Sequence, residues 1–430
     1  MVKSSRSLKQ ATAFRLEALE DRTLPAVDFG FAYAMGDNSS LSNRSQAWDI
    51  ALDLDGNTVI TGAFQGTVNF NPRGPSAFNL TSSSSSATDI FVAKYDPFGA
   101  MIWAKGFGGS LYDEGYGVIT DNDGNVYATG YFQGTVSFGG SSLTSEGVSD
   151  AFIIKLSGAD GSTTWAQHYW GYDTSLNNYG EDLDVDIWGN VYTCGIYDGP
   201  YGQTNPENMF LLKLDSAGNY LWYGEFEGTG LSDASNVAVD EWGQVYFSGS
   251  FSNTMDFDMK AGDFNLTSRG KTDVFLAKYD TAGNFLWAES WGGTEADRGY
   301  ALILDGMANA YVSGSFQGTA QMDPANAGYT GPFALTSLGQ DDIFLNKFTD
   351  QGVIEWTVHN GGSGDDEGLS LAVDSRSQIY LTGSFQNTAT FPVGSANSLT
   401  ANNAAGNLAT FVQKISQEGT TAWVKQLGGY

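Results

Sequence analysis

The phrases GQVYFSGSF at 243–251 and DVFLAKYDTAGNFLWAESWGG at 273–293 decide the fold of this chain of 430 residues. Five further versions of the first phrase occur, at 56–64, 124–132, 189–197, 308–316 and 377–385. One glycine recurs in all six, at intervals of 68, 65, 54, 65 and 69 residues: Gly62, Gly130, Gly195, Gly249, Gly314 and Gly383. A regular period of this size indicates a repeat architecture, in which each copy is one unit that buries its faces against its neighbours.

Each copy predicts four short strands. In the copy at 234–293 they fall at 236–240, 244–251, 273–280 and 284–290, in phrases rich in Val, Phe, Tyr and Trp. Glycine in the linking turns, at Gly243 and Gly283, supplies the positive φ that a short hairpin needs. Four-stranded antiparallel units repeated around an axis make a β-propeller. We therefore expect an all-β propeller of six four-stranded blades, with seven as the alternative.

The segments between the second and third strands are long and carry short apolar pairs of their own. In the segment at 65–88 these are TVNF and FNLT, which predict a small extra hairpin that hangs from the blade. The segment DFGFAYAMGD at 28–37 resembles a fourth strand, and it either closes the ring or begins a further blade. We expect residues 1–26 to be an export or targeting segment or a disordered tail. Residues 27–430 are then one domain, with repeats at about 47–109, 110–171, 172–229, 230–293, 294–362 and 363–430.

The pattern VAVDxxGNVYVTGSF followed by DVFLAKYDxxGNxLWAxxxGG resembles the bacterial SBBP-type β-propeller repeat, over roughly Ala47 to Tyr430. This resemblance implies a propeller in a secreted or surface-attached bacterial protein, and no particular activity. The family name indicates seven blades, whereas six copies are present. The phrase FRLEALEDRTLPA at 14–26 resembles the LExLExRxLL-type N-terminal signature of large bacterial surface proteins, with Pro25 where a second Leu is common. That resemblance implies export to an extracellular or cell-surface location.

The composition excludes several kinds of partner. The chain has 49 acidic and 20 basic residues and a formal net charge of −29, which disfavours nucleic acid and anionic membranes and favours cations or basic partners. No apolar run is long enough for a Sec-type signal or for membrane insertion. The lone cysteine, Cys194, lies in a strand phrase, and we expect it to be buried. The sequence does not determine the oligomeric state.

Aspartates precede four of the six first strands: Asp113, Asp233, Asp297 and Asp366. The first strand of a propeller blade lines the central channel, so these loops are expected to rim its mouth. Carboxylate oxygens are the ligands that calcium prefers, so we hypothesise that these four residues bind calcium. The alternative is that each aspartate bonds backbone in the adjoining blade and fixes the step between blades. No other cofactor is expected.

Three further positions recur in every copy of the repeat, here called columns, and have structural interpretations. An aspartate that ends each first strand is expected to bond the N–H groups of the following turn: Asp53, Asp121, Asp186, Asp240, Asp305 and Asp374. One tryptophan per fourth strand is expected to pack between blades: Trp103, Trp165, Trp222, Trp287, Trp356 and Trp423. One lysine per third strand is expected to lay its stem on apolar surface and pair its amine with an acid: Lys94, Lys155, Lys213, Lys278, Lys347 and Lys414.

Two aromatic residues stand outside these columns. Trp188 and Trp242 occupy the tips of the same turn in successive copies, where the other copies have Asp55, Asp123, Met307 and Arg376. We hypothesise that this pair stacks on a sugar or a protein partner; packing on the next blade is the alternative. Both tight turns of a blade should lie on one face of the ring. The long inserts and acidic loops should lie on the other, which the variable lengths favour as the binding face.

Catalytic patterns are not found. The chain has two histidines, His168 and His359, and no GxSxG, HExxH or phosphate-binding loop. With 49 acidic residues, some pair of carboxylates is always available, so acidic pairs do not indicate glycoside hydrolysis. We therefore predict a non-enzymatic extracellular or cell-surface module that binds a protein or glycan or acts as a scaffold. The alternatives are a calcium-stabilised structural surface protein and a polysaccharide-active enzyme.

Overall fold

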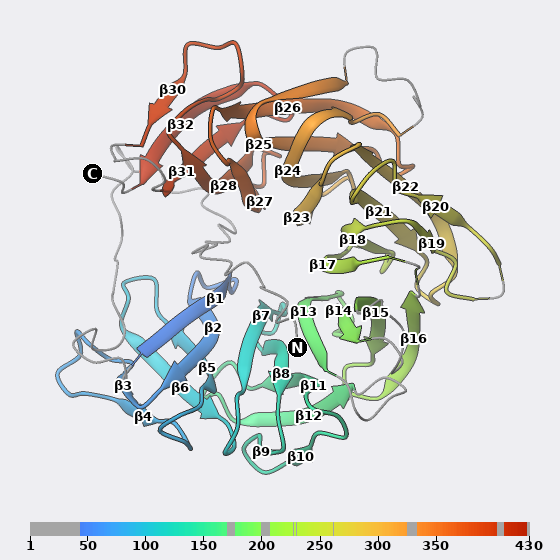
Figure 1. The fold of residues 1–430 in the computed structure, drawn as a ribbon. Helices are drawn as coiled ribbons and strands as arrows, with labels where there is room; N and C mark the ends of the chain where they lie inside the picture. The colour runs from blue at the N-terminus through green and yellow to red at the C-terminus, as the bar shows by residue number, and fades with distance from the viewer. Residues whose placement is uncertain are drawn as a thin grey trace.

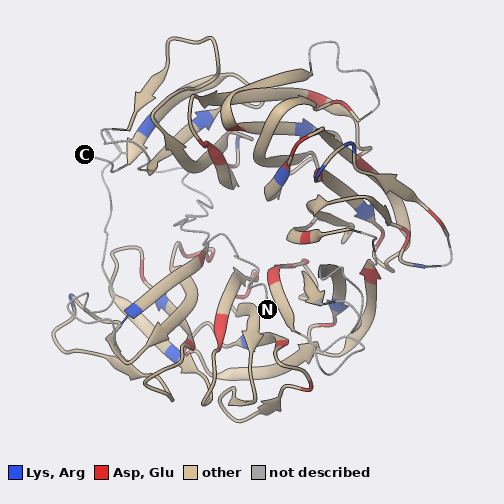
Figure 2. Cartoon of the chain, viewed as in Figure 1, with Lys and Arg blue, Asp and Glu red and all other residues tan. Residues whose placement is uncertain are grey.

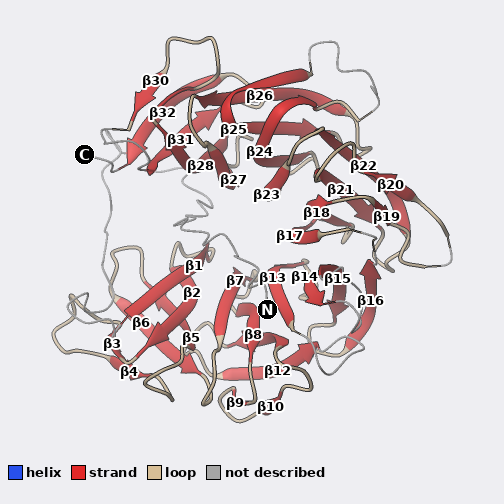
Figure 3. Ribbon diagram, viewed as in Figure 1, coloured by secondary structure: helices blue, strands red, loops and turns tan. Residues whose placement is uncertain are grey.

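The computed structural model describes residues 44–169, 177–198, 207–226, 228, 230–260, 262–324, 333–401 and 408–427. All the regular elements in these ranges are strands, as Figure 3 shows. They form six four-stranded antiparallel units, called blades 1 to 6 below. The predicted all-β propeller fold is confirmed.

The blades follow the order of the chain. Blade 1 contains β1 (Arg44–Leu52), β2 (Thr58–Gln65), β5 (Asp89–Tyr95) and β6 (Met101–Phe107). Blade 2 contains β7 (Glu114–Thr120), β8 (Val126–Phe132), β11 (Asp150–Leu156) and β12 (Thr163–Tyr169). Blade 3 contains β13 (Asn178–Val185), β14 (Val191–Asp198), β15 (Glu207–Leu214) and β16 (Tyr220–Phe226). Blade 4 contains β17 (Ser232–Val239), β18 (Val245–Phe251), β21 (Asp273–Tyr279) and β22 (Phe285–Gly293). Blade 5 contains β23 (Arg298–Leu304), β24 (Ala310–Gln321), β25 (Ala334–Phe348) and β26 (Ile354–Gly362). Blade 6 contains β27 (Glu367–Val373), β28 (Ile379–Gln386), β31 (Leu408–Ile415) and β32 (Thr421–Leu427).

The blades are arranged around a centre. Figure 1 shows the first strands β1, β7, β13, β17, β23 and β27 closest to it, and each of these contacts the next. Blades 1 and 6 are separated by a wider space than the other neighbouring blades in this view. The predicted closing strand at 28–37 and the tail at 1–26 lie outside the described residues. Ring closure and a seventh blade therefore stay predictions.

The core lies between the blades. All residues of the second strands β8 and β18 and of the third strands β5 and β21 are buried, so these strands read as continuous rather than alternating apolar runs. One cluster joins blades 3 and 4 through Tyr192, Phe226, Phe247 and Phe275. Full burial of each such aromatic side chain contributes roughly 1.5–3 kcal/mol. Cys194 belongs to this cluster and is fully buried, as predicted.

Close backbone approach explains the glycine that repeats in every copy. The first strand bulges opposite this glycine, and a Cβ there would lie 1.8–2.0 Å from a first-strand carbonyl oxygen in all six blades. No side chain fits at that distance, so only glycine allows the first and second strands to pair.

The inserts form the predicted hairpins: β3 (Thr67–Asn69) with β4 (Asn79–Thr81), β9 (Thr135–Ser137) with β10 (Ser142–Thr144), β19 (Thr254–Asp256) with β20 (Asn265–Thr267), and β29 (Thr388–Thr390) with β30 (Ser398–Thr400). In blades 5 and 6 the insert also pairs with the preceding blade. The insert part of β24 pairs with the end of β22, and β29 pairs with the end of β26. Each of these inserts therefore braces its blade against the fourth strand of the blade before it.

Candidate functional site

Both tight turns of a blade lie at the same end, as predicted. In blade 1 the residue that opens β2 pairs with the one that closes β5, and a Cβ on Gly56 would lie 3.7 Å from Pro97 in the other turn. The tight-turn face is the surface made by these turns in all six blades. The loops between blades lie at the other end, where the inserts also begin. The blade 4 insert extends back to the tight-turn face, where Lys260 Nζ donates to Ala282 O at 2.9 Å.

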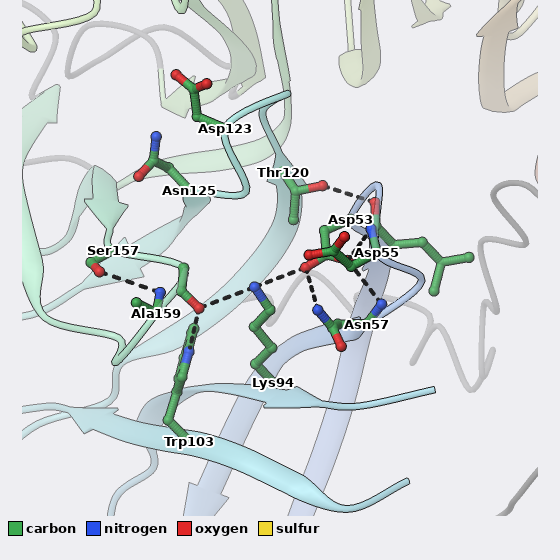
Figure 4. Close-up of polar contacts among 12 residues, drawn as sticks. Asp53, Asp55, Asn57, Lys94, Trp103, Thr120, Asp123, Asn125, Ser157 and Ala159 are labelled. Atoms are coloured by element: carbon green, nitrogen blue, oxygen red, sulfur yellow. Dashed lines mark hydrogen bonds and ion pairs between the residues drawn. The ribbon is translucent and has the colours of Figure 1, made fainter. Parts of the chain in front are cut away.

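The turn aspartates stiffen this face. In blade 1, Asp53 Oδ1 accepts the backbone N–H groups of Asp55 and Asn57 at 3.0 and 2.8 Å (Figure 4). Asp53 Oδ2 accepts the Asn57 amide and pairs with Lys94 Nζ, both at 2.8 Å. Burial acts to raise the pKa of Asp53, but the bonds from Lys94 and Asn57 outweigh it and leave this pKa below its ordinary value. The predicted turn-capping role is confirmed.

Tryptophan, joined by lysine in blades 1, 3 and 4, bonds each of the first five blades to a turn of the next blade. Lys94 Nζ and Trp103 Nε1 both donate to the carbonyl oxygen of Gly158, in the turn between β11 and β12, at 3.0 and 3.1 Å (Figure 4). The tryptophans of blades 2 to 5 donate in the same way at 3.0–3.1 Å: Trp165, Trp222, Trp287 and Trp356. Their rings lie on turn glycines, where a Cβ would come within 2.8–3.1 Å. The predicted packing of this column between blades is confirmed for these five tryptophans.

Trp188 and Trp242 lie on the tight-turn face with 57% and 59% of their side chains exposed. Their backbone N–H groups donate to Asp186 and Asp240, so the turn geometry of both is fixed. The Trp188 ring comes within 3.2 Å of the Cβ position on Gly243, the residue after Trp242. The two tips are therefore adjacent, and Trp188 packs on the next blade while it remains open to solvent.

Two more exposed apolar side chains extend this surface. Ile187 precedes Trp188 and is 60% exposed, and Met307 occupies the corresponding tip of blade 5 and is 58% exposed. The aromatic tip patch is defined as Ile187, Trp188, Trp242 and Met307. Ile187 and Met307 were not part of the hypothesised binding pair, although Met307 occupies the same turn position as the two tryptophans.

The four aspartates of the calcium hypothesis do not share one environment. Asp113, Asp297 and Asp366 are buried, and each accepts two backbone N–H groups at 2.6–3.3 Å. The first donor is the backbone N–H four residues before the aspartate. The second is the backbone N–H of a glutamine at or near the end of the second strand in the blade that the aspartate precedes. Asp233 instead lies within β17, opposite Ser250, and is half-buried. Three of the four therefore fix the step between blades, and calcium binding stays a prediction.

The structure brings a second aspartate beside each of these three. Asp89 and Asp273 begin the third strands β5 and β21, and Asp342 lies at the corresponding position within β25. All three are buried, and each has one carboxylate oxygen without a hydrogen-bond partner. A Cβ added to Gly292 would lie 2.9 Å from Asp273 Cγ and 2.6 Å from Asp297 Oδ2, so the two carboxyl groups are close to each other. These second aspartates could have been found from the sequence, because four of the six copies of the third-strand phrase begin with Asp.

Burial governs the protonation of these carboxylates. It raises the pKa of Asp113 to about 7, of Asp297 to about 8 and of Asp366 to about 7, against the backbone N–H bonds that lower it. Within the described ranges, no three His, Cys, Asp or Glu side chains are arranged to hold a metal ion. Calcium would therefore have to bind between pairs of carboxylates and backbone oxygens.

Both histidines contact third-strand aspartates. His168 Nδ1 lies 2.8 Å from Asp150 Oδ2, and His359 Nε2 lies 2.6 Å from Asp342 Oδ2. Each pair spans the third and fourth strands of one blade, so this contact ties the two strands together.

Comparisons with known proteins support a repeat propeller. No protein-family model matches the chain. It is 25% identical over 411 residues to an uncharacterized WD repeat-containing protein of Acanthamoeba polyphaga mimivirus, covering 78% of this chain and 29% of that protein. It is 30% identical over 115 residues to the regulatory protein FlaEY of Caulobacter vibrioides, covering 27% of this chain and 12% of that protein. The chain thus spans less than a third of the length of either relative.

Solved structures with a similar arrangement have low sequence identity. They include the quinohemoprotein alcohol dehydrogenase of Comamonas testosteroni, at 11% identity and a TM-score of 0.41 over 90% of this chain and 68% of that one. BamB of Moraxella catarrhalis has 14% identity and a TM-score of 0.29 over 82% and 95% of the two chains. These likenesses carry no argument about function. The SBBP resemblance and the N-terminal signature stay predictions. The described residues contain no helix long and apolar enough to cross a membrane.

Proposed function

We propose that the protein is a non-enzymatic binding module of the extracellular space or cell surface, which holds a macromolecular partner against its tight-turn face. The observation that carries this proposal is the pair of exposed tryptophans, Trp188 and Trp242, on adjacent turns. Exposed apolar patches mark interaction surfaces, and tryptophan is enriched among the residues that dominate binding energy.

The rigidity of the turns supports a binding role. Asp186 accepts four hydrogen bonds within its own blade, from the backbone of Trp188 and Asn190, the Asn190 amide and the Tyr192 hydroxyl. The backbone that carries Trp188 is therefore ordered before a partner arrives. A preorganised surface loses less conformational entropy on binding, so more of the contact energy appears as affinity.

The proposed binding face is the tight-turn face, whereas the sequence favoured the face that carries the long inserts and the acidic loops. The inserts of blades 5 and 6 pair with preceding blades, which gives them a structural role. The tight-turn face carries the exposed aromatic tips. The proposed location rests on the resemblance of the repeats and of the N-terminal phrase to those of bacterial surface proteins.

The test is a binding screen of the full chain on a glycan array and a phage-displayed peptide library. Ligands should bind the wild type and lose affinity about 30-fold or more for Trp188→Ser/Trp242→Ser, since a central tryptophan contributes about 2 kcal/mol or more. Phe98→Ser is the matched control, because Phe98 is 81% exposed on the same face but in blade 1. Ligands that bind the double variant as well as the wild type would refute the proposal.

A calcium-stabilised structural role is the second candidate, and the unpartnered oxygens of Asp89, Asp273 and Asp342 favour it. A cation that binds only the folded state raises apparent stability with its concentration. Thermal unfolding of the full chain in calcium and in EDTA tests this role. An unfolding midpoint that is the same in both solutions would reject it.

A further inference from the structure

We infer that the partner of the tight-turn face is a protein segment with apolar side chains flanked by Lys or Arg, rather than a glycan. This inference rests on the proposed function and adds the chemistry of the partner. Three observations carry it: the character of the aromatic tip patch, the engagement of the polar groups beneath it, and the charge around it.

The patch is apolar and draws on three blades. Its four side chains, Ile187, Trp188, Trp242 and Met307, are 57–60% exposed and come from blades 3, 4 and 5. Contact of the Trp188 ring with the turn of blade 4 leaves no break between the first two tips. Tryptophan with an aliphatic residue and methionine offers adaptable apolar contact, which suits the side chains of a protein partner.

The turn carboxylates beneath the blade 3 and blade 5 tips are already engaged, whereas Asp240 Oδ2, beneath the blade 4 tip, is buried without a hydrogen-bond partner. Asp186 and Asp305 are buried and each accepts four hydrogen bonds inside its own blade. A bound sugar needs donors and acceptors for its hydroxyls beside the ring on which it stacks. These carboxylates are turned inward, so the blade 3 and blade 5 tips present apolar groups to a partner.

The surrounding charge is negative. The tips of the twelve turns carry one basic residue, Arg376, and six acidic residues: Asp55, Asp123, Asp160, Glu241, Asp350 and Glu418. One further basic residue reaches this face from the blade 4 insert: Lys260 Nζ donates to Ala282 O and Asn284 Oδ1, in a turn of blade 4. Glu241 is exposed next to Trp242. Figure 2 shows Lys and Arg spread among the blades rather than gathered on one of them. Electrostatic complementarity favours a partner with basic residues around its apolar anchors and disfavours an acidic one.

Defined probes test the inference. The probes are a synthetic amphipathic peptide of Leu and Lys, the same peptide with Glu in place of Lys, and a cellulose oligosaccharide, each titrated calorimetrically against the full chain. We expect the Lys peptide to bind, the Glu peptide and the oligosaccharide not to bind, and added salt to weaken the Lys peptide. Trp188→Ser/Trp242→Ser should lower affinity for the Lys peptide about 30-fold or more, and Phe98→Ser should not.

Other results would overturn the inference in distinguishable ways. Equal binding of the Lys peptide to the double tryptophan variant would show attraction by net charge alone. Oligosaccharide binding that disappears in that variant would identify a glycan site, which refutes the inference but keeps the proposed function. If Glu241→Gln leaves the affinity for the Lys peptide unchanged, while Asp123→Gln on blade 2 lowers it, the acidic residue beside the aromatic tip patch does not attract the peptide. That result would overturn the inference.

Discussion

Replacement of Asp297 by Asn should remove the loss of stability that its ionisation causes at the junction between blades 4 and 5 as pH rises. Asp297 is 1% exposed, and burial raises its pKa to about 8, with the nearby carboxylates of Asp273 and Asp341 adding to the rise. In the unfolded chain its pKa returns to the ordinary value of 3.8. Between these two values the folded protein binds the proton more tightly than the unfolded chain does.

The sign follows from this difference. The protonated carboxyl is fully compatible with burial below pH 4, and stability falls as pH rises from about 4 to about 8, where the loss levels off. Each pKa unit corresponds to about 1.4 kcal/mol, so the loss from this group is at most about 5–6 kcal/mol. Asparagine does not titrate, and Asn178 occupies the same position between blades 2 and 3, so the fold accommodates an amide there.

The assay is urea unfolding from pH 5 to pH 9 in EDTA. Asp297→Asn should be about 1 kcal/mol less stable than the wild type near pH 5, because its amide cannot accept both backbone N–H groups. It should be more stable than the wild type near pH 9, so the two curves cross. Asp123→Asn, an exposed tip with the same change in charge, should leave the wild-type dependence unchanged. A constant difference between Asp297→Asn and the wild type at every pH would refute the reasoning.

Three further predictions concern the repeat. Gly314→Ala should unfold the protein or cost several kcal/mol, because the new Cβ would lie 1.8 Å from a carbonyl oxygen; Gly306→Ala, with nothing within 4 Å, should be near neutral, and circular dichroism melting compares them. Ser377→Gly should raise stability by about 0.5–1 kcal/mol by relieving a φ of 55°, whereas Gly124→Ser should cost a similar amount at φ 76°, as measured by denaturant titration. Trp287→Phe should cost about 1 kcal/mol of unfolding free energy by removing the Nε1 bond to the next blade; an unchanged midpoint would mean that this bond contributes nothing.

Much of the blade could be predicted from the sequence because it depends on local physics. The phrase at 243–251 specifies a strand by its apolar and β-branched or aromatic residues, and the turn before it by aspartate and glycine. The turn bonds join residues two and four apart, as for Asp240 with Trp242 and Gln244. Such bonds form whatever the rest of the chain does, so the six copies predicted blades, turns and the tryptophan and lysine columns.

The candidate surface was only half predictable. Trp188 and Trp242 were recognisable because they break the pattern of their column. Their exposure and adjacency depend on how blade 3 meets blade 4, and so does the inclusion of Ile187 and Met307. The sequence alone does not fix the rotation from one blade to the next, because many packings satisfy the same apolar pattern.

The sequence by itself determined a propeller of repeated four-stranded blades, the glycines that let their strands approach, and the acidic character of the whole chain. Only the tertiary structure decided which groups meet across the steps: the insert of one blade with the fourth strand of another, Asp273 with Asp297, and Trp287 with a carbonyl 63 residues away. Local bonds form between neighbours in the chain, whereas these contacts exist only after whole blades have packed, so their partners cannot be read from any single repeat.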